Sequence, residues 1–155
     1  MPGYAIVNLM ELENGAREGG PTLEARFARS AIESEHIGVS HFRYAPGRRS
    51  NRGHSHTEQE EVYVVLSGSG RVKLDDELAD VRPWDVVRVA PGTFRGFAAG
   101  PEGLELLAIG SDRPEGATAF SQTTTGGATK APCVPRSASS DIPARSPNVR
   151  LPPPE

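Results

Sequence analysis

The stretch Gly53-His54-Ser55-His56-Thr57-Glu58-Gln59-Glu60-Glu61 is the most informative part of this sequence. Side chains alternate between the two faces of a β-strand, so His54 and His56 are expected on the same side. A turn after His56 would bring Glu60 or Glu61 back to face the two histidines. Two imidazoles and one carboxylate on one wall form a ligand set that divalent metal ions use in proteins.

An apolar run, Val62–Leu66, follows this stretch directly and leads to Gly68-Ser69-Gly70. We predict a core strand over Glu61–Leu66 that ends in a hairpin turn at these glycines. No helix start follows the turn, so it is not predicted to cradle a phosphate. The candidate metal ligands therefore stand where a buried strand begins, and such a scaffold holds side chains rigidly.

Turn signals recur at short intervals along the chain, and the segments between them are short and rich in valine and leucine. Residues 23–32 fit a helix face as well as a strand, but we favour a strand because residues 37–44 can pair with it as a hairpin. Many short strands with close turns predict an all-β sandwich or barrel. Besides Glu61–Leu66, the predicted strands are Tyr4–Leu9, Leu23–Ile32, Ile37–Tyr44, Arg71–Leu74, Leu78–Val81, Val86–Val89, Phe94–Phe97 and Leu104–Ile109.

Composition limits the function classes that fit this chain. Its 155 residues are enough for one domain with a real core. The net charge of −3 argues against a general nucleic-acid binder, which is usually basic. No apolar run approaches the length of about 20 residues that spans a bilayer. A single cysteine, Cys133, excludes an intrachain disulfide and fits a reducing compartment. We therefore expect a cytoplasmic protein without a nucleic-acid or membrane partner.

The composition changes after Gly110. Residues 111–155 contain eight of the fourteen prolines and eleven serines or threonines, with few large apolar side chains. Such a segment cannot bury enough apolar surface to offset the entropy lost on ordering. We predict one folded domain over residues 1–110 and a disordered tail over residues 111–155.

The spacing of the His-rich stretch resembles the first motif of the cupins, which is G-x5–6-H-x-H-x3–4-E-x6-G. The distance to the closing glycine favours Glu61 over Glu60. Residues 83–95 resemble the second cupin motif, G-x5-P-x-G-x2-H-x3-N, in a weakened form, and Arg95 stands where that motif has its histidine. The resemblance covers about residues 34–109, and its first motif is carried by Gly47, His54, His56, Glu61 and Gly68.

This resemblance implies a double-stranded β-helix, a small jelly-roll barrel with its ligand site inside. In metal-binding cupins, the two histidines, the glutamate and the second motif's histidine hold one divalent ion, commonly Fe, Mn, Ni or Zn. By position, the implied metal ligands are His54, His56 and Glu61, and the fourth ligand is missing. Small cupins often pair through an edge strand, so the resemblance also implies a homodimer.

Arg95 leaves three arrangements open, because an arginine keeps its proton and cannot be a metal ligand. In the first, Arg95 pairs with Glu61 and replaces the metal. In the second, the three remaining ligands keep the metal, and Arg95 clamps an anionic substrate that separates the two positive charges. In the third, Arg95 turns to the barrel rim. A metal and a metal-free pocket are thus both compatible with the sequence.

Further residues are candidates for contact with a ligand. Arg43 and its arginine neighbours flank the first motif. They either form a positively charged entrance to the barrel that attracts anions or are solvated loop charges. Tyr63 shares strand parity with Glu61, so it is either a core tyrosine or a residue that orients a ligand or acts as a weak acid. Glu60 is a second candidate for carrying a proton.

We therefore expect a protein that binds a small polar or anionic ligand inside the barrel through Arg95, Tyr63 and Arg43. Its metal site is expected to be incomplete. The alternative is a small metal-dependent enzyme, such as a sugar isomerase or epimerase, a decarboxylase or an oxygenase.

Overall fold

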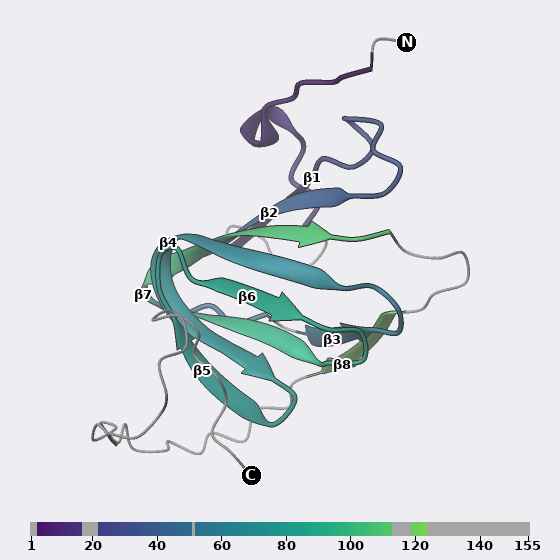
Figure 1. The fold of residues 1–155 in the computed structure, drawn as a ribbon. Coiled ribbons are helices and arrows are strands. Elements are labelled where there is room, and N and C mark those ends of the chain that lie inside the picture. Colours follow the sequence, from purple (N-terminus) through teal and green to yellow (C-terminus); the bar gives the residue numbers. More distant parts are fainter. Residues whose placement is uncertain (1–2, 17–21, 51, 113–118, 124–155) are drawn as a thin grey trace, which may run out of the picture. The chain divides into compact units, whose positions relative to one another are not determined.

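The computed structural model describes residues 3–16, 22–50, 52–112 and 119–123. Their strands all pair antiparallel and belong to one compact unit that ends at Thr124 (Figure 1). These residues contain no α-helix, and none of their segments is a helix able to cross a membrane. The all-β prediction is confirmed. In chain order the elements are the 3-10 turn η1 (Leu9–Glu11), β1 (Leu23–Phe27), β2 (Gly38–Tyr44), β3 (Arg52–His56), β4 (Glu61–Leu74), β5 (Glu77–Val81), β6 (Val86–Val89), β7 (Arg95–Gly110) and β8 (Ala119–Thr123).

Two long strands, β4 and β7, run through both walls of the barrel and bend on the same side (Figure 1). The second half of β7 pairs with β2 and with the start of β4. The first half of β7 pairs with the end of β4, and Arg95 faces His54 of β3 across the ladder. This is the arrangement of a double-stranded jelly roll.

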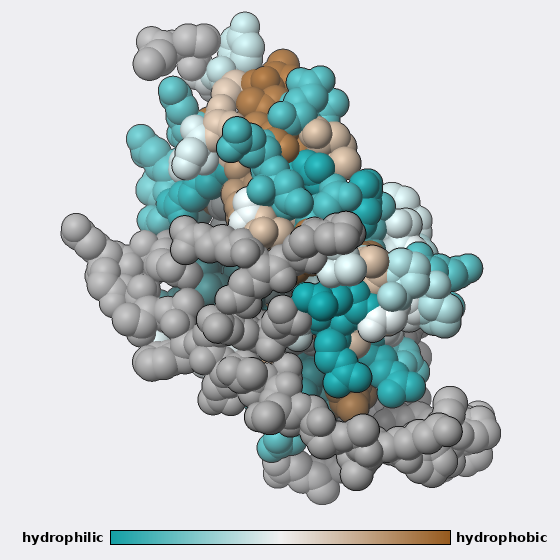
Figure 2. Space-filling view, turned by 180° about the vertical axis from the view of Figure 1, so that it is seen from behind, coloured by the Kyte–Doolittle hydropathy of each residue, from teal (hydrophilic) through white to brown (hydrophobic). Residues whose placement is uncertain are grey.

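The core lies between the two walls. Along β4 and β7, buried apolar residues alternate with more exposed ones, as expected for strands with one face inside. Each fully buried apolar side chain contributes about 1.5–3 kcal/mol. Among the residues coloured in Figure 2, hydrophilic side chains cover much of the visible face, and apolar ones gather near its top. The buried core cluster consists of Tyr44, Tyr63, Val65, Val72, Val81, Val89, Phe97, Ala99, Leu104, Leu106 and Ala108.

The predicted hairpin turn at Gly68-Ser69-Gly70 is wrong. Strand β4 continues through these residues, and the register with β7 shifts between Val65 and Ser67 and again between Gly68 and Gly70. A bulge of this kind bends a strand without ending it. Likewise, Gly100-Pro101 does not divide β7. The glycines mark the bend between the two walls, which local turn patterns cannot distinguish from a chain reversal.

The predicted strand at Tyr4–Leu9 is also wrong. This segment pairs with no strand among the described residues, and its Tyr4 and Ile6 are 76% and 89% exposed. An apolar run has strand propensity, but it becomes a strand only when a partner offers hydrogen bonds. The next prediction is confirmed in part: Leu23–Phe27 forms a strand that pairs with β2, whereas residues 29–32 lie in turns.

The sheet continues beyond residue 110, the predicted end of the domain, with β8 at Ala119–Thr123. Strand β8 pairs with β3 from Arg52 to His56 and thus supports the strand that carries both histidines. Strand β8 was not predicted from the sequence, because the residues around it are polar and proline-rich. The rest of the predicted tail, from residue 124 onward, lies outside the described residues.

Candidate metal and ligand site

The two histidines of the site come from β3 and lie on the same side of the strand, as the alternation of side chains requires. The ring centres of His54 and His56 are 4.9 Å apart, and the rings meet edge to face at 73°. His56 is only 6% exposed. Strand β3 is held between β7 and β8, so both imidazoles are fixed on its inner face.

Glu61 completes this cluster from the first position of β4. The possible ligand atoms of His54, His56 and Glu61 all lie within 4.8 Å of one another. Glu60, by contrast, points to the other side of the chain. Its carboxylate forms an ion pair with Arg88, and both side chains are largely exposed. The structure therefore brings Glu61, and not Glu60, to the two histidines.

Arg95 enters the same cluster from the start of β7 and is 2% exposed. Its Nε donates to the hydroxyl of Tyr63 at 3.2 Å, and one terminal nitrogen donates to the carbonyl oxygen of His54 at 3.2 Å. The other terminal nitrogen forms an ion pair with Oε2 of Glu61. Of the three arrangements that the sequence left open, the one with Arg95 at the barrel rim is wrong.

Tyr63 links Arg95 to Glu61. Its hydroxyl donates to Oε2 of Glu61 at 2.5 Å, and its ring packs against Phe97 with centroids 4.8 Å apart. Burial and the adjacent negative charge of Glu61 raise the pKa of Tyr63. The hydroxyl therefore stays protonated at neutral pH, where it can donate a hydrogen bond or a proton but cannot act as a base.

The carboxylate of Glu61 is held in its ionised form. Burial alone would raise its pKa, but hydrogen bonds from His56 and Tyr63 and the charge of Arg95 outweigh burial and lower the pKa to about 2. Divalent cations bind carboxylates in their ionised form and imidazoles in their neutral form. An ionised Glu61 next to two imidazoles therefore suits such a cation.

The residues present fit a divalent ion with three protein ligands. Nε2 of His56 lies 3.2 Å from Oε1 of Glu61. Two atoms that each lie about 2.1 Å from one ion are about 3.0–3.4 Å apart at octahedral or tetrahedral angles. The ligand atoms of the cluster lie within 4.8 Å of one another, which is wider than this spacing, so side-chain rotation is needed to bring all three onto one ion. Arg95 does not occupy Oε1, because its contact is with Oε2.

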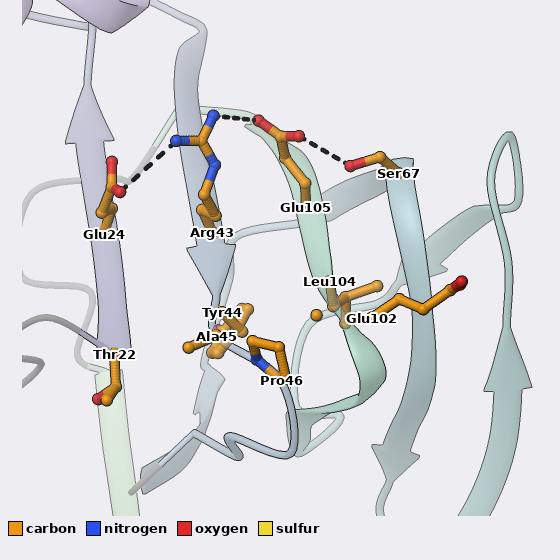
Figure 3. A pocket seen from close by; sticks show the side chains of 11 residues that line it. Thr22, Glu24, Arg43, Tyr44, Ala45, Pro46, Ser67, Glu102, Leu104 and Glu105 are labelled. Atoms are coloured by element: carbon orange, nitrogen blue, oxygen red, sulfur yellow. Dashed lines mark hydrogen bonds and ion pairs between the residues drawn. The ribbon is translucent and has the colours of Figure 1, made fainter.

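Arg43 does not join this cluster. It lies in a pocket beside β1 and β2, where its guanidinium contacts Glu105 at 3.0 Å and Glu24 at 3.5 Å. Figure 3 shows the chain of interactions that runs from Glu24 through Arg43 to Glu105 and Ser67. The charge of Arg43 is thus compensated by two carboxylates. The contact with Glu105 is not evident from local sequence, because β2 and β7 are far apart in the chain, whereas Glu24 lies opposite Arg43 in the predicted hairpin.

The same outer network contains His41, which is 2% exposed and lies with Nε2 2.7 Å from Oε1 of Glu105. Burial alone would raise the pKa of Glu105, but hydrogen bonds from His41, Ser67 and Arg43 lower it to about 2. An unfolded glutamate has a pKa of about 4.3. Ionised Glu105 therefore stabilises the fold above that value, and the contribution is lost as the pH falls toward 2.

This linkage predicts how Glu105→Gln behaves across the pH range. At pH 7 the variant is expected to lose about 3 kcal/mol of unfolding free energy relative to the native chain. The difference should shrink between pH 4.5 and 2, because the native carboxylate then becomes protonated. Urea denaturation at a series of pH values measures this. A difference that does not change with pH would show that Glu105 contributes through packing alone.

The fold and the site together define a class of protein: an antiparallel jelly-roll barrel with a partly buried His-His-Glu cluster. Comparison with known proteins agrees. The family model described as "Cupin domain" matches residues 40–110. No protein with a curated description matches the chain in sequence. The family model and the solved structures with the same fold support the cupin superfamily for this chain, which the resemblance of its first motif implied.

Solved structures with the same fold have varied functions. A cupin protein from Bacteroides fragilis is 22% identical, with a TM-score of 0.61 over 74% of this chain and 88% of that one. The polyketide cyclase RemF from Streptomyces resistomycificus is 21% identical, with a TM-score of 0.62 over 77% and 84%. A putative sugar phosphate isomerase from Acidithiobacillus ferrooxidans is 26% identical, with a TM-score of 0.53 over 59% and 60%. The shared fold alone does not select one chemistry.

Proposed function

We propose that this protein binds a small polar or anionic ligand inside its barrel, at a divalent metal site with three protein ligands. The observation that supports this most strongly is the convergence of His54, His56 and Glu61 within 4.8 Å on the inner face of the barrel. Two histidines and one carboxylate are the set used by many metal sites that leave positions open for an external ligand. The ion would thus bring Lewis acidity to a ligand in the barrel.

Two further side chains would contact that ligand. Arg95 supplies a buried positive charge, and Tyr63 supplies a protonated hydroxyl directly beside it. Guanidinium groups bind carboxylate and phosphate oxygens strongly because charge and hydrogen bonds act together. Arg43 lies outside this group, so we do not assign it to the ligand.

Elemental analysis tests the metal part of the proposal. Protein purified without a histidine tag and without chelator is expected to carry about one divalent ion per chain. The His54→Ala variant should lose the ion, because it removes one of three ligands. The matched control is His36→Ala, which removes an exposed histidine outside the cluster and should retain the ion. Equal metal content in native protein and His54→Ala, or none in the native protein, would contradict the proposal.

A second candidate is a small metal-dependent enzyme such as a sugar isomerase. It is favoured by the 26% identity with a structure described as a putative sugar phosphate isomerase. In such a reaction, Tyr63 would donate a proton to the substrate, since its hydroxyl stays protonated. Turnover of a sugar phosphate that is lost in Tyr63→Phe would favour this candidate, whereas binding without turnover would favour the first. The predicted homodimer and the predicted cytoplasmic location stay predictions.

A further inference from the structure

Arg95 occupies the position of the missing metal ligand, and its contacts fix it there. The side chain is 2% exposed and is held by the Tyr63 hydroxyl, the His54 carbonyl and Oε2 of Glu61. A guanidinium has five N–H groups. Among the described residues these contacts use three of them, so two N–H groups can still donate to a ligand. Arg95 is therefore a fixed positive charge inside the proposed ligand site.

The two oxygens of Glu61 have different partners. Oε2 accepts hydrogen bonds from Tyr63 and Arg95, whereas Oε1 lies 3.2 Å from Nε2 of His56. An ion bound through Oε1 does not require Arg95 to leave. The sequence presented an Arg95–Glu61 pair and a bound metal as alternatives. In this geometry the site can hold both at once.

The sum of the charges in the site indicates which kind of ligand must bind together with the ion. Glu61 carries one negative charge, and Arg95 already balances it. Metal-bound imidazoles are neutral, and so is a tyrosine hydroxyl near pH 7. A divalent ion therefore leaves two uncompensated positive charges beside side chains that are 2% and 6% exposed, Arg95 and His56. Uncompensated charge in such surroundings is strongly unfavourable.

We propose that the divalent ion and a doubly charged oxyanion bind this site together, and that the anion contacts both the ion and Arg95. This inference rests on the function proposed above and specifies its ligand as a dicarboxylate or a phosphate group. Linkage between two bound species is reciprocal. The anion must therefore raise the affinity for the ion by the same factor as the ion raises the affinity for the anion.

Calorimetric titration with Co²⁺, with and without inorganic sulfate, tests this coupling. Sulfate is the probe because it carries two negative charges at neutral pH. In the native protein, saturating sulfate is expected to lower the Kd for Co²⁺ by about tenfold or more. In Arg95→Met, Co²⁺ should bind more tightly than in the native protein without sulfate, and sulfate should then change its Kd by less than about threefold.

Two further variants keep the test decisive. Arg71→Met is the matched control, because it removes an exposed arginine of β4 and should leave the coupling unchanged. Arg95→Lys keeps the charge but loses the planar fork, so it should retain the coupling even if Arg95→Met does not fold. A native Kd for Co²⁺ that sulfate does not change would overturn this inference and leave the proposed metal site standing. Absence of Co²⁺ binding under both conditions would overturn both.

Discussion

Replacing Gly68 by alanine is expected to destabilise the protein by about 3–5 kcal/mol, a large part of the stability of a typical domain. Gly68 has a φ of +75°, which costs an alanine free energy in itself. In addition, an added Cβ would overlap the carbonyl oxygen of Gly103, where β4 passes close to β7. Backbone cannot move aside as a flexible side chain can. Urea denaturation, read as a shift of the midpoint, measures the loss.

Gly92→Ala is the matched control for this prediction. Gly92 has a similar φ of +84°, but nothing lies within 4 Å of an added Cβ. It should therefore show only the backbone cost, about 1 kcal/mol. If the two substitutions had equal effects, the close approach of β4 and β7 would not be the cause.

Arg95→Met is expected to have an effect of similar size, about 3–5 kcal/mol, when stability is measured with a chelator present. The substitution leaves the Glu61 carboxylate in a site where its side chain is 14% exposed and without its positive partner. Removing one member of a buried ion pair costs more than removing both, because the remaining charge is uncompensated. Thermal or urea unfolding of the variant measures the loss.

A double-mutant cycle separates the pair from its surroundings. Glu61→Gln alone should also destabilise the protein, since it leaves the Arg95 charge buried. The double variant should lose less than the sum of the two single losses, by about 2 kcal/mol. Additive losses would show that Arg95 and Glu61 stabilise the barrel independently, and would weaken the charge argument for the bound anion.

Much of the site could be predicted from local sequence. The spacing between His54 and His56 fixes their common side of a strand, and the resemblance to the first cupin motif, which sets the distance to Gly68, favoured Glu61. Two local predictions were wrong because they needed long-range information. The Gly68 region looks like a turn locally but is a bulge against β7, and the Tyr4–Leu9 run has strand propensity without a strand partner.

The sequence by itself predicted an all-β fold and placed His54 and His56 on one side of a strand, which are local consequences of turn spacing and side-chain alternation. The resemblance to the cupin motifs added the barrel and the choice of Glu61, and it placed Arg95 where the second motif has its histidine. Only the tertiary structure decided that Arg95 turns inward, that it binds Oε2 of Glu61 and leaves Oε1 facing His56, and that Arg43 is committed to Glu24 and Glu105. The contacts of Arg95 with Glu61 and of Arg43 with Glu105 join strands far apart in the sequence, so the register between strands determines which of these charges meet.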